Sequence, residues 1–228
     1  MIKTVLFDLD ETLFDFKKAE AIALSKTLRL LKIEPTDYII SQYSKYNISQ
    51  WKRLELGEIT RQEVKINRYK LLFDELGVDA SPDLATKIYE ENLSKGHYFI
   101  DGAVEMLENI YKHYDLYIVS NGTKTVQEGR LLSSGIKKYF KGVFISESVG
   151  YEKPSIEFFN SCFRSITDFE KEKTVIIGDS LSSDIKGGNN AGIKTIWFNS
   201  NNDKNNTDLK IDVEVHGLSE IKNALLSL

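Results

Sequence analysis

The 228-residue chain has almost no cysteine, since Cys162 is the only one. A single cysteine excludes an intrachain disulfide and is typical of a protein in a reducing compartment. Cys162 lies between Phe159 and Phe163, and this aromatic setting predicts core packing rather than a nucleophilic role.

Long apolar runs and an excess of positive charge are also missing. No apolar stretch approaches the roughly 20 residues of a membrane-spanning helix. Met1 leads almost directly into a predicted strand, so we expect no signal peptide. The formal net charge of -4 argues against a large nucleic-acid-binding surface. We therefore expect a cytoplasmic protein that binds neither a membrane nor a nucleic-acid polymer.

The residues that are present, 41% hydrophobic and 28% charged, are typical of a globular protein with one sizeable core or a core with an insertion. Apolar segments predict strands at 4–7, 117–119, 143–145, 174–177 and 195–198, with a short edge strand at 211–215. Helical segments are predicted at about 102–113, 123–138, 154–166, 181–191 and 218–228. This alternation predicts βαβ units and a parallel sheet.

Residues 15–98 interrupt this pattern, because they contain no convincing strand. Apolar residues such as Leu24 and Leu28 recur there at helical spacing. Gly77 is a predicted helix C-cap and Pro82 a predicted helix start. We therefore predict a core formed by residues 1–14 and 99–228, and an inserted helical cap formed by residues 15–98.

Asp8 and Asp10 lie just past the first predicted strand, where ligands bind in open α/β sheets. They are two residues apart, so near-extended backbone would point both side chains in the same direction. Two packed carboxylates need a raised pKa or a cation between them, and Mg²⁺ is the simplest such cation. The alternative is a pair of turn residues with Thr12 as a helix N-cap.

Polar residues also follow later strands. Ser120, with the N–H groups of Asn121 and its turn, could hold phosphate oxygens, although a helix N-cap explains this segment equally well. Lys153, with Pro154 predicted to open the next helix, could supply positive charge to a phosphoryl group. Most lysines are solvated surface residues, so neither segment identifies a site alone.

Asp179 ends a fully apolar strand, and Asp184 follows five residues later at a predicted helix start. Asp179 could complete a metal site with Asp8 and the backbone carbonyl of Asp10. Asp184 could anchor Lys153 or a metal-bound water. N-capping explains Asp184 but is a weaker explanation for a carboxylate at the tip of an apolar strand.

Four motifs thus follow strands in a fixed order: D-x-D-x-T at 8–12, S-N-G at 120–122, K-P at 153–154 and G-D-S-x-x-x-D at 178–184. This series resembles the haloacid dehalogenase-like (HAD) hydrolase superfamily across essentially the whole chain. The resemblance implies an α/β fold with a Rossmann-like parallel sheet of strand order 5-4-1-2-3 and a helical cap inserted after the first strand. D-L-D-E-T-L-F-D-F and W-K-R-L-E-L-G-E-I-T-R-Q-E further resemble the YjjG-type pyrimidine 5′-nucleotidases.

The resemblance implies a mechanism as well. Asp8 would form an aspartyl-phosphate, and Asp10 would act as general acid and then as general base. Mg²⁺ would be held by Asp8, the Asp10 carbonyl and Asp179. The non-bridging phosphate oxygens would be bound by four residues: Thr12, Ser120, Asn121 and Lys153. The dehalogenases of the superfamily lack the second aspartate and the Mg²⁺ site, so Asp10 and Asp179 favour phosphate chemistry over halide chemistry.

The expected substrate is a small phosphomonoester, a pyrimidine nucleoside monophosphate, bound by a monomer or a small homo-oligomer. Phe16 at the cap hinge and Trp51 in the cap are candidate substrate contacts. A phosphatase of sugar phosphates or other small phosphomonoesters is an alternative. A phosphosugar mutase is another, with a second phosphate site at Arg53 or Arg61. A phospho-accepting or binding module is the non-enzyme alternative, although receiver-type switches are shorter and have no inserted cap.

Overall fold

The computed structural model describes residues 1–228. A six-stranded sheet forms its centre, and every neighbouring pair of strands is parallel. The strands lie in the order β3-β2-β1-β4-β5-β6. Their bounds are Thr4–Phe7 (β1), Asp115–Ser120 (β2), Gly142–Ile145 (β3), Thr174–Gly178 (β4), Lys194–Phe198 (β5) and Val213–Val215 (β6). In the opposite direction this is the predicted order 5-4-1-2-3 with β6 added beside β5, so the predicted α/β fold is confirmed.

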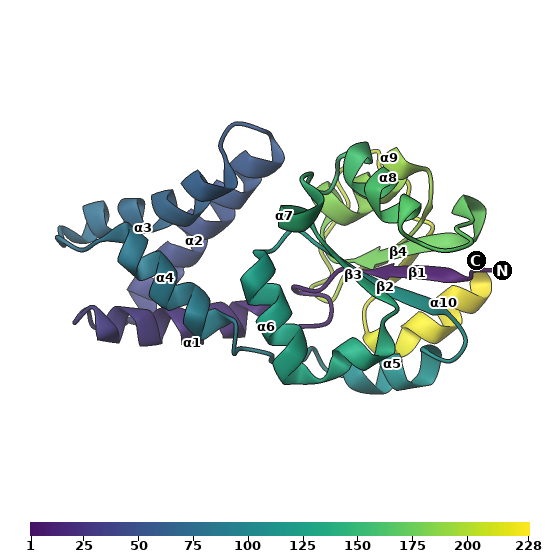
Figure 1. Cartoon of the computed structure of the whole chain (residues 1–228), viewed down its shortest axis with the longest axis horizontal. Helices are drawn as coiled ribbons and strands as arrows, with labels where there is room; N and C mark the ends of the chain where they lie inside the picture. The colour runs from purple at the N-terminus through teal and green to yellow at the C-terminus, as the bar shows by residue number, and fades with distance from the viewer.

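Helices cover both faces of the sheet because its central strand is apolar on both sides. Val5 and Phe7 of β1 pack into one hydrophobic cluster and Leu6 into another, and all three are fully buried. The first cluster also contains residues of α5 (Ala103–Ile110), α6 (Lys124–Ser134) and α10 (Ile221–Ser227). The second contains residues of α8 (Ile156–Arg164) and α9 (Lys186–Ala191). The result is a three-layer arrangement (Figure 1).

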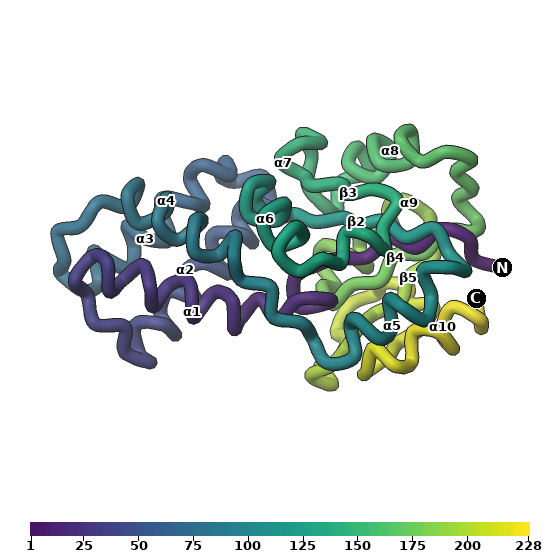
Figure 2. The backbone as a smooth tube through the Cα atoms, turned by 60° about the horizontal axis from the view of Figure 1, so that its bottom comes forward, coloured from purple at the N-terminus to yellow at the C-terminus, as the bar shows by residue number.

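The segment after β1 forms four helices, which we call the cap: α1 (Phe16–Leu30), α2 (Asp37–Glu55), α3 (Arg61–Leu76) and α4 (Pro82–Leu93). They share a hydrophobic cluster that is separate from those of the sheet and is centred on Tyr43, Tyr69 and Tyr89. Figures 1 and 2 both show the cap to one side of the sheet, with the two chain termini at the opposite end. The exact domain boundaries at residues 14/15 and 98/99 stay a prediction.

Several helix boundaries follow the signals in the sequence. Ser81 caps α4 with Pro82 in its first turn, and Gly77 ends α3 with a left-handed φ of 62°. No helix in the chain combines the length and the apolar character needed to cross a membrane.

Other boundaries differ from the prediction. The predicted helix at 123–138 divides at Gly135, whose φ of 71° ends α6 before a short 3₁₀ turn. Pro154 does not open a helix, because α8 begins at Ile156 with Ser155 as its N-cap. A short helix that was not predicted, α7 (Ser146–Val149), follows β3.

Candidate active site

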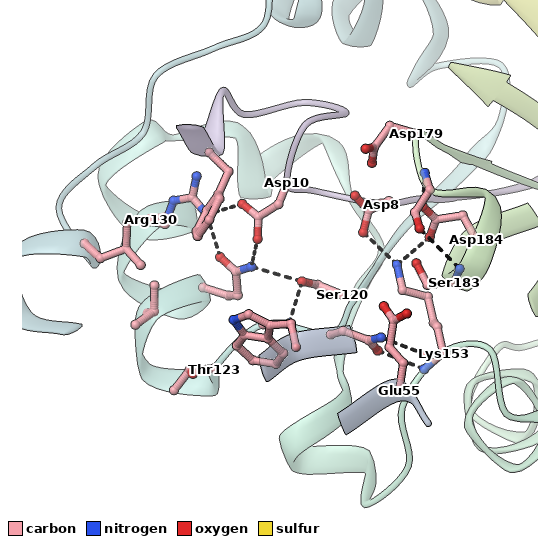
Figure 3. Close-up of a pocket in the computed structure, with 18 of the residues that line it drawn as sticks. Asp8, Asp10, Glu55, Ser120, Thr123, Arg130, Lys153, Asp179, Ser183 and Asp184 are labelled. Carbon is pink, nitrogen blue, oxygen red and sulfur yellow. Dashed lines mark hydrogen bonds and ion pairs between the residues drawn. The ribbon is translucent and has the colours of Figure 1, made fainter. Parts of the chain in front are cut away.

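Asp8 lies at the carboxyl end of the central strand, between the ends of its two neighbours. Its backbone N–H continues the ladder by donating to the carbonyl of Ile177 in β4 at 2.9 Å. A pocket of about 220 Å³ opens there, between the sheet and the cap. Its walls include these predicted residues: Asp8, Asp10, Phe16, Trp51, Ser120, Asn121, Lys153, Asp179 and Asp184. Figure 3 labels Asp8, Asp10, Ser120, Lys153, Asp179 and Asp184 among them.

Lys153 is buried in this pocket and binds three oxygen atoms with its ammonium group. Nζ donates to Asp8 Oδ1 at 2.6 Å, to Asp184 Oδ1 at 2.7 Å and to the Val119 carbonyl at 2.8 Å. Burial alone would lower the pKa of Lys153, but Asp184 and Asp8 raise it above its usual value. The lysine is therefore a fixed positive charge beside Asp8, and the predicted role of Asp184 as its anchor agrees with this geometry.

Asn121 holds the backbone of Lys153 in place. Its side-chain Nδ2 donates to the Lys153 carbonyl, and its Oδ1 accepts from the Lys153 N–H, both at 2.8 Å. The turn after β2 is thus tied to the loop that carries the lysine. Ser120, the last residue of β2, is buried, and its hydroxyl oxygen accepts from the Gly122 N–H at 3.1 Å.

Three carboxylates gather around this lysine. Oxygen atoms of Asp8, Asp179 and Asp184 all lie within 4.8 Å of one another. The close approach depends on Gly178, because a Cβ there would lie 2.3 Å from the Asp184 carboxylate. Burial, together with Asp184 and Asp10, raises the pKa of Asp8 to about 7 despite the opposing charge of Lys153. Burial and Asp8 likewise raise the pKa of Asp179.

The electrostatics of this cluster fit a divalent cation. One lysine does not balance three carboxylates. Burial, and after it the neighbouring carboxylates, raise the pKa of both Asp8 and Asp179. Buried carboxylate oxygens are the ligands that Mg²⁺ prefers. The donor set of this site is therefore suited to a hard metal ion.

Thr12 has a different neighbour from the one predicted. Its hydroxyl accepts from the Asp179 N–H at 3.2 Å and donates to Asp179 Oδ1 at 3.4 Å. Thr12 is fully buried and is not among the residues that line the pocket. In this structure it positions Asp179, and its contact with phosphate stays a prediction.

Asp10 lines the same pocket as Asp8 but has different partners. Its carboxylate accepts from Arg130 Nη1 and, at 2.6 Å, from Gln127 Nε2 of the same helix (Figure 3). Neither residue was predicted to belong to the site. Their spacing of three places them on one face of α6, but nothing in that spacing indicates that they are buried or that they reach Asp10.

The cap reaches the pocket through several side chains. Phe16, the first residue of α1, and Trp51 of α2 both line it, and their contact with a substrate stays a prediction. Arg68 of α3 lines it too and is held by Asn47 Oδ1, which accepts from Arg68 Nη1 at 3.0 Å. Glu55 at the end of α2 accepts from the Ser182 hydroxyl at 3.1 Å.

The two arginines considered for a second phosphate site have other partners. Arg61 donates to the carbonyl of Asn121, to Ser146 Oγ and to Glu152, all of which lie outside the cap. Arg53 is exposed and paired with Glu58 at 3.1 Å. Neither lines the pocket, and a second phosphate site at either arginine stays a prediction.

Known proteins resemble this chain in sequence and in fold. The model of the family described as haloacid dehalogenase-like hydrolase matches residues 5–198. The chain belongs to this family. It is 40% identical over 223 residues to the HAD-hydrolase YfnB of Bacillus subtilis, covering 98% of this chain and 95% of that protein. A crystal structure of YfnB bound to magnesium, in a form that reveals interdomain movement, superposes with a TM-score of 0.94 over 98% of each chain.

Two further relatives have more specific names. The pyrimidine 5′-nucleotidase PynA of Streptococcus pneumoniae is 38% identical over 98% of this chain and 94% of its own length. The pyrimidine 5′-nucleotidase YjjG of Escherichia coli is 27% identical over 97% of this chain and 96% of its own length. The predicted hydrolase and its similarity to YjjG-type proteins are therefore confirmed.

Proposed function

We propose that the chain is a Mg²⁺-dependent phosphomonoester hydrolase that works through an aspartyl-phosphate and acts on pyrimidine nucleoside monophosphates. The observation that carries the chemistry is the position of Asp8, a buried carboxylate at the tip of the central strand with a lysine at 2.6 Å. The relatives PynA and YjjG support the substrate class, because each is named as a pyrimidine 5′-nucleotidase and aligns over nearly its full length.

In the first half-reaction Asp8 attacks phosphorus while the ester P–O bond breaks, and Asp10 gives its proton to the leaving oxygen. In the second half-reaction the Asp10 carboxylate takes a proton from a water molecule, which attacks the aspartyl-phosphate and releases Asp8. Ser120, the Asn121 N–H and Lys153 bind the non-bridging oxygens. Lys153 also keeps the attacking oxygen of Asp8 in one orientation.

Asp8, the Asp10 carbonyl and Asp179 would hold Mg²⁺. When bound, it supplies the positive charge that lets an anionic carboxylate approach an anionic phosphate. Asp184 accepts a second hydrogen bond from Lys153 and so helps to fix the lysine side chain.

The cap side of the pocket suits a nucleoside. Phe16 and Trp51 offer aromatic faces for a base, and Arg68 offers guanidinium donors to carbonyl oxygens such as those of a pyrimidine. These three residues come from α1, α2 and α3, so one ligand in the pocket would contact most of the cap.

The test is the release of phosphate from a panel of esters, with and without Mg²⁺. The panel contains UMP, dUMP, dTMP, AMP, GMP and several sugar phosphates, and Asp8→Asn is assayed beside the wild type. We expect Mg²⁺-dependent release, fastest from the pyrimidine nucleotides, and none from the variant. A preference for sugar phosphates would remove the nucleotidase assignment and leave the mechanism intact. Bisphosphate-dependent isomerisation without net release would instead identify a mutase.

A further inference from the structure

Helix α6 holds both oxygens of the Asp10 carboxylate. Arg130 Nη1 donates to Oδ1, and Gln127 Nε2 donates to Oδ2 at 2.6 Å. The two donors are also bonded to each other, since Gln127 Oε1 accepts from Arg130 Nη1 at 3.0 Å. Three side chains therefore form one closed arrangement, and the direction of the Asp10 carboxylate is set from α6.

Arg130 is itself fixed in position. It is fully buried, and its Cζ lies 4.8 Å from the ring centre of Phe14 and 5.8 Å from that of Phe16. Its Nε donates to the Gly96 carbonyl at 2.6 Å, and Asp10 is its sole acidic partner. A buried guanidinium is costly unless its N–H groups are hydrogen-bonded, so Asp10 and Nη1 of Arg130 hold each other in position.

Gln127 extends the arrangement to the phosphate-binding turn. Its Nε2 also donates to Ser120 Oγ at 3.0 Å, so one amide group contacts both Asp10 and Ser120. This reach requires Gly122, because a Cβ at that position would lie 2.3 Å from Gln127 Nε2. The glycine of the S-N-G motif thus leaves space for a side chain that links two site residues.

Asp10 is nevertheless accessible to a ligand. Its side chain keeps 27% of its surface exposed, and it lines the pocket beside Asp8. Each carboxylate oxygen has two lone-pair directions, and the α6 donors use one on each. The remaining directions are available on the pocket side.

We infer that Gln127 and Arg130 are positioning residues for Asp10, which aim its carboxyl group at the leaving oxygen of the substrate. This inference rests on the proposed function. In the step concerned, the O–H proton of Asp10 moves to the leaving oxygen as its bond to phosphorus breaks, and Asp10 becomes a carboxylate. A carboxyl group that rotates freely transfers this proton less often in the required direction.

The dependence of kcat/KM on the leaving group distinguishes a positioning role from a merely structural one. A nucleoside monophosphate releases an alkoxide and needs the proton, whereas p-nitrophenyl phosphate releases a stable phenolate and does not. The quantity to compare is kcat/KM, because it reports the first half-reaction. For Gln127→Met, which keeps the side-chain volume but removes the donor, we expect kcat/KM to fall about 10- to 100-fold for UMP and less than about 3-fold for p-nitrophenyl phosphate. Arg130→Lys should change the ratio of the two values in the same direction.

Three further variants serve as references for this experiment. Asp10→Asn should change the ratio more, and adding Gln127→Met to it should change the ratio no further. Glu128→Gln, on the exposed face of the same helix, should leave both values unchanged. Equal losses on the two substrates, or no loss on UMP, with an active wild type would overturn the positioning role alone. A wild type that hydrolyses neither ester would overturn the proposed function together with this inference.

Discussion

Arg61, the first residue of α3, donates a hydrogen bond of 2.8 Å to the carbonyl oxygen of Asn121 in the turn after β2. The same guanidinium donates to Ser146 Oγ at 2.6 Å and to Glu152 Oε1 at 3.0 Å. One cap side chain therefore contacts the turn after β2, the first residue of α7 and the loop after α7. Its Cζ also lies 5.4 Å from the ring centre of Trp51, which lines the pocket. Arg61 thus links the cap to the core beside the pocket.

Replacing Arg61 should weaken the contact between the cap and the core. Hydrogen bonds to charged groups contribute about 1.5–3 kcal/mol each, so Arg61→Gln should raise KM for UMP by about tenfold or more, with a smaller change in kcat. Steady-state kinetics at saturating Mg²⁺ measure both. Arg53→Gln is the matched control, because Arg53 is exposed and contacts only cap residues. An unchanged KM for Arg61→Gln would show that the contact does not govern closure.

The buried lysine should be essential for stability as well as for activity. Lys153→Met leaves Asp8 and Asp184 without their positive partner, and breaking a buried ion pair typically costs about 3–5 kcal/mol. Urea unfolding without Mg²⁺ should detect a loss of this size. The pair of exposed Lys141 and half-buried Asp115 provides the comparison, since Lys141→Met should cost about 1 kcal/mol or less. Equal losses of unfolding free energy for the two variants would contradict this stabilising role of Lys153.

Repulsion within the acidic cluster should lower the stability of the metal-free protein, so removing one of its charges should stabilise that form. Asp179→Asn removes one of three carboxylates whose oxygens lie within 4.8 Å, so we expect its melting temperature without metal to exceed that of the wild type by a few degrees. Added Mg²⁺ should raise the melting temperature of the wild type by mass action and leave the variant nearly unchanged. Asp203→Asn, in an exposed loop, is the control for loss of one negative charge. If Mg²⁺ stabilised Asp179→Asn as much as the wild type, Asp179 would not be a ligand.

Cys162 should be inert in the folded protein. It is fully buried in the cluster between the sheet and α8, and burial raises the pKa of its thiol to about 12. The thiolate is the reactive form, so iodoacetamide at about pH 8 should label the unfolded chain in urea but not the native protein. Intact-mass measurement distinguishes the two. Rapid labelling of the native protein would contradict core packing at this position.

The strands follow from the sequence because they depend on local composition, whereas the order of the sheet was implied by the resemblance to the family. Apolar runs such as Thr4–Phe7 and Thr174–Gly178 form strands that are buried on both faces. Their alternation with helical segments leaves few possible topologies. The polar residues that directly follow these strands meet at one edge for the same reason. Asp8, Ser120 and Asp179 were therefore predictable as neighbours.

Residues that act over long distances in the chain were not predictable in this way. Arg130 meets Asp10 across 120 positions and Arg61 meets Asn121 across 60, and each resembles an ordinary surface arginine in its local sequence. Thr12 follows the aspartate pair in the chain, yet a turn with Glu11 at a φ of 60° places its hydroxyl on Asp179. Loop geometry and tertiary packing decide such contacts, and neither has a periodic pattern in the sequence.

The most direct test of the proposed chemistry is the detection of phosphate on Asp8 during turnover. The wild type is mixed with UMP and Mg²⁺, stopped in acid within one turnover and digested, and the peptides are examined by mass spectrometry. We expect a phosphoryl group on the peptide that contains Asp8, with the acyl phosphate lost on treatment with hydroxylamine, and none in Asp8→Asn. Rapid phosphate release from UMP with no phosphorylated peptide at any time, or with the phosphoryl group on another residue, would contradict it.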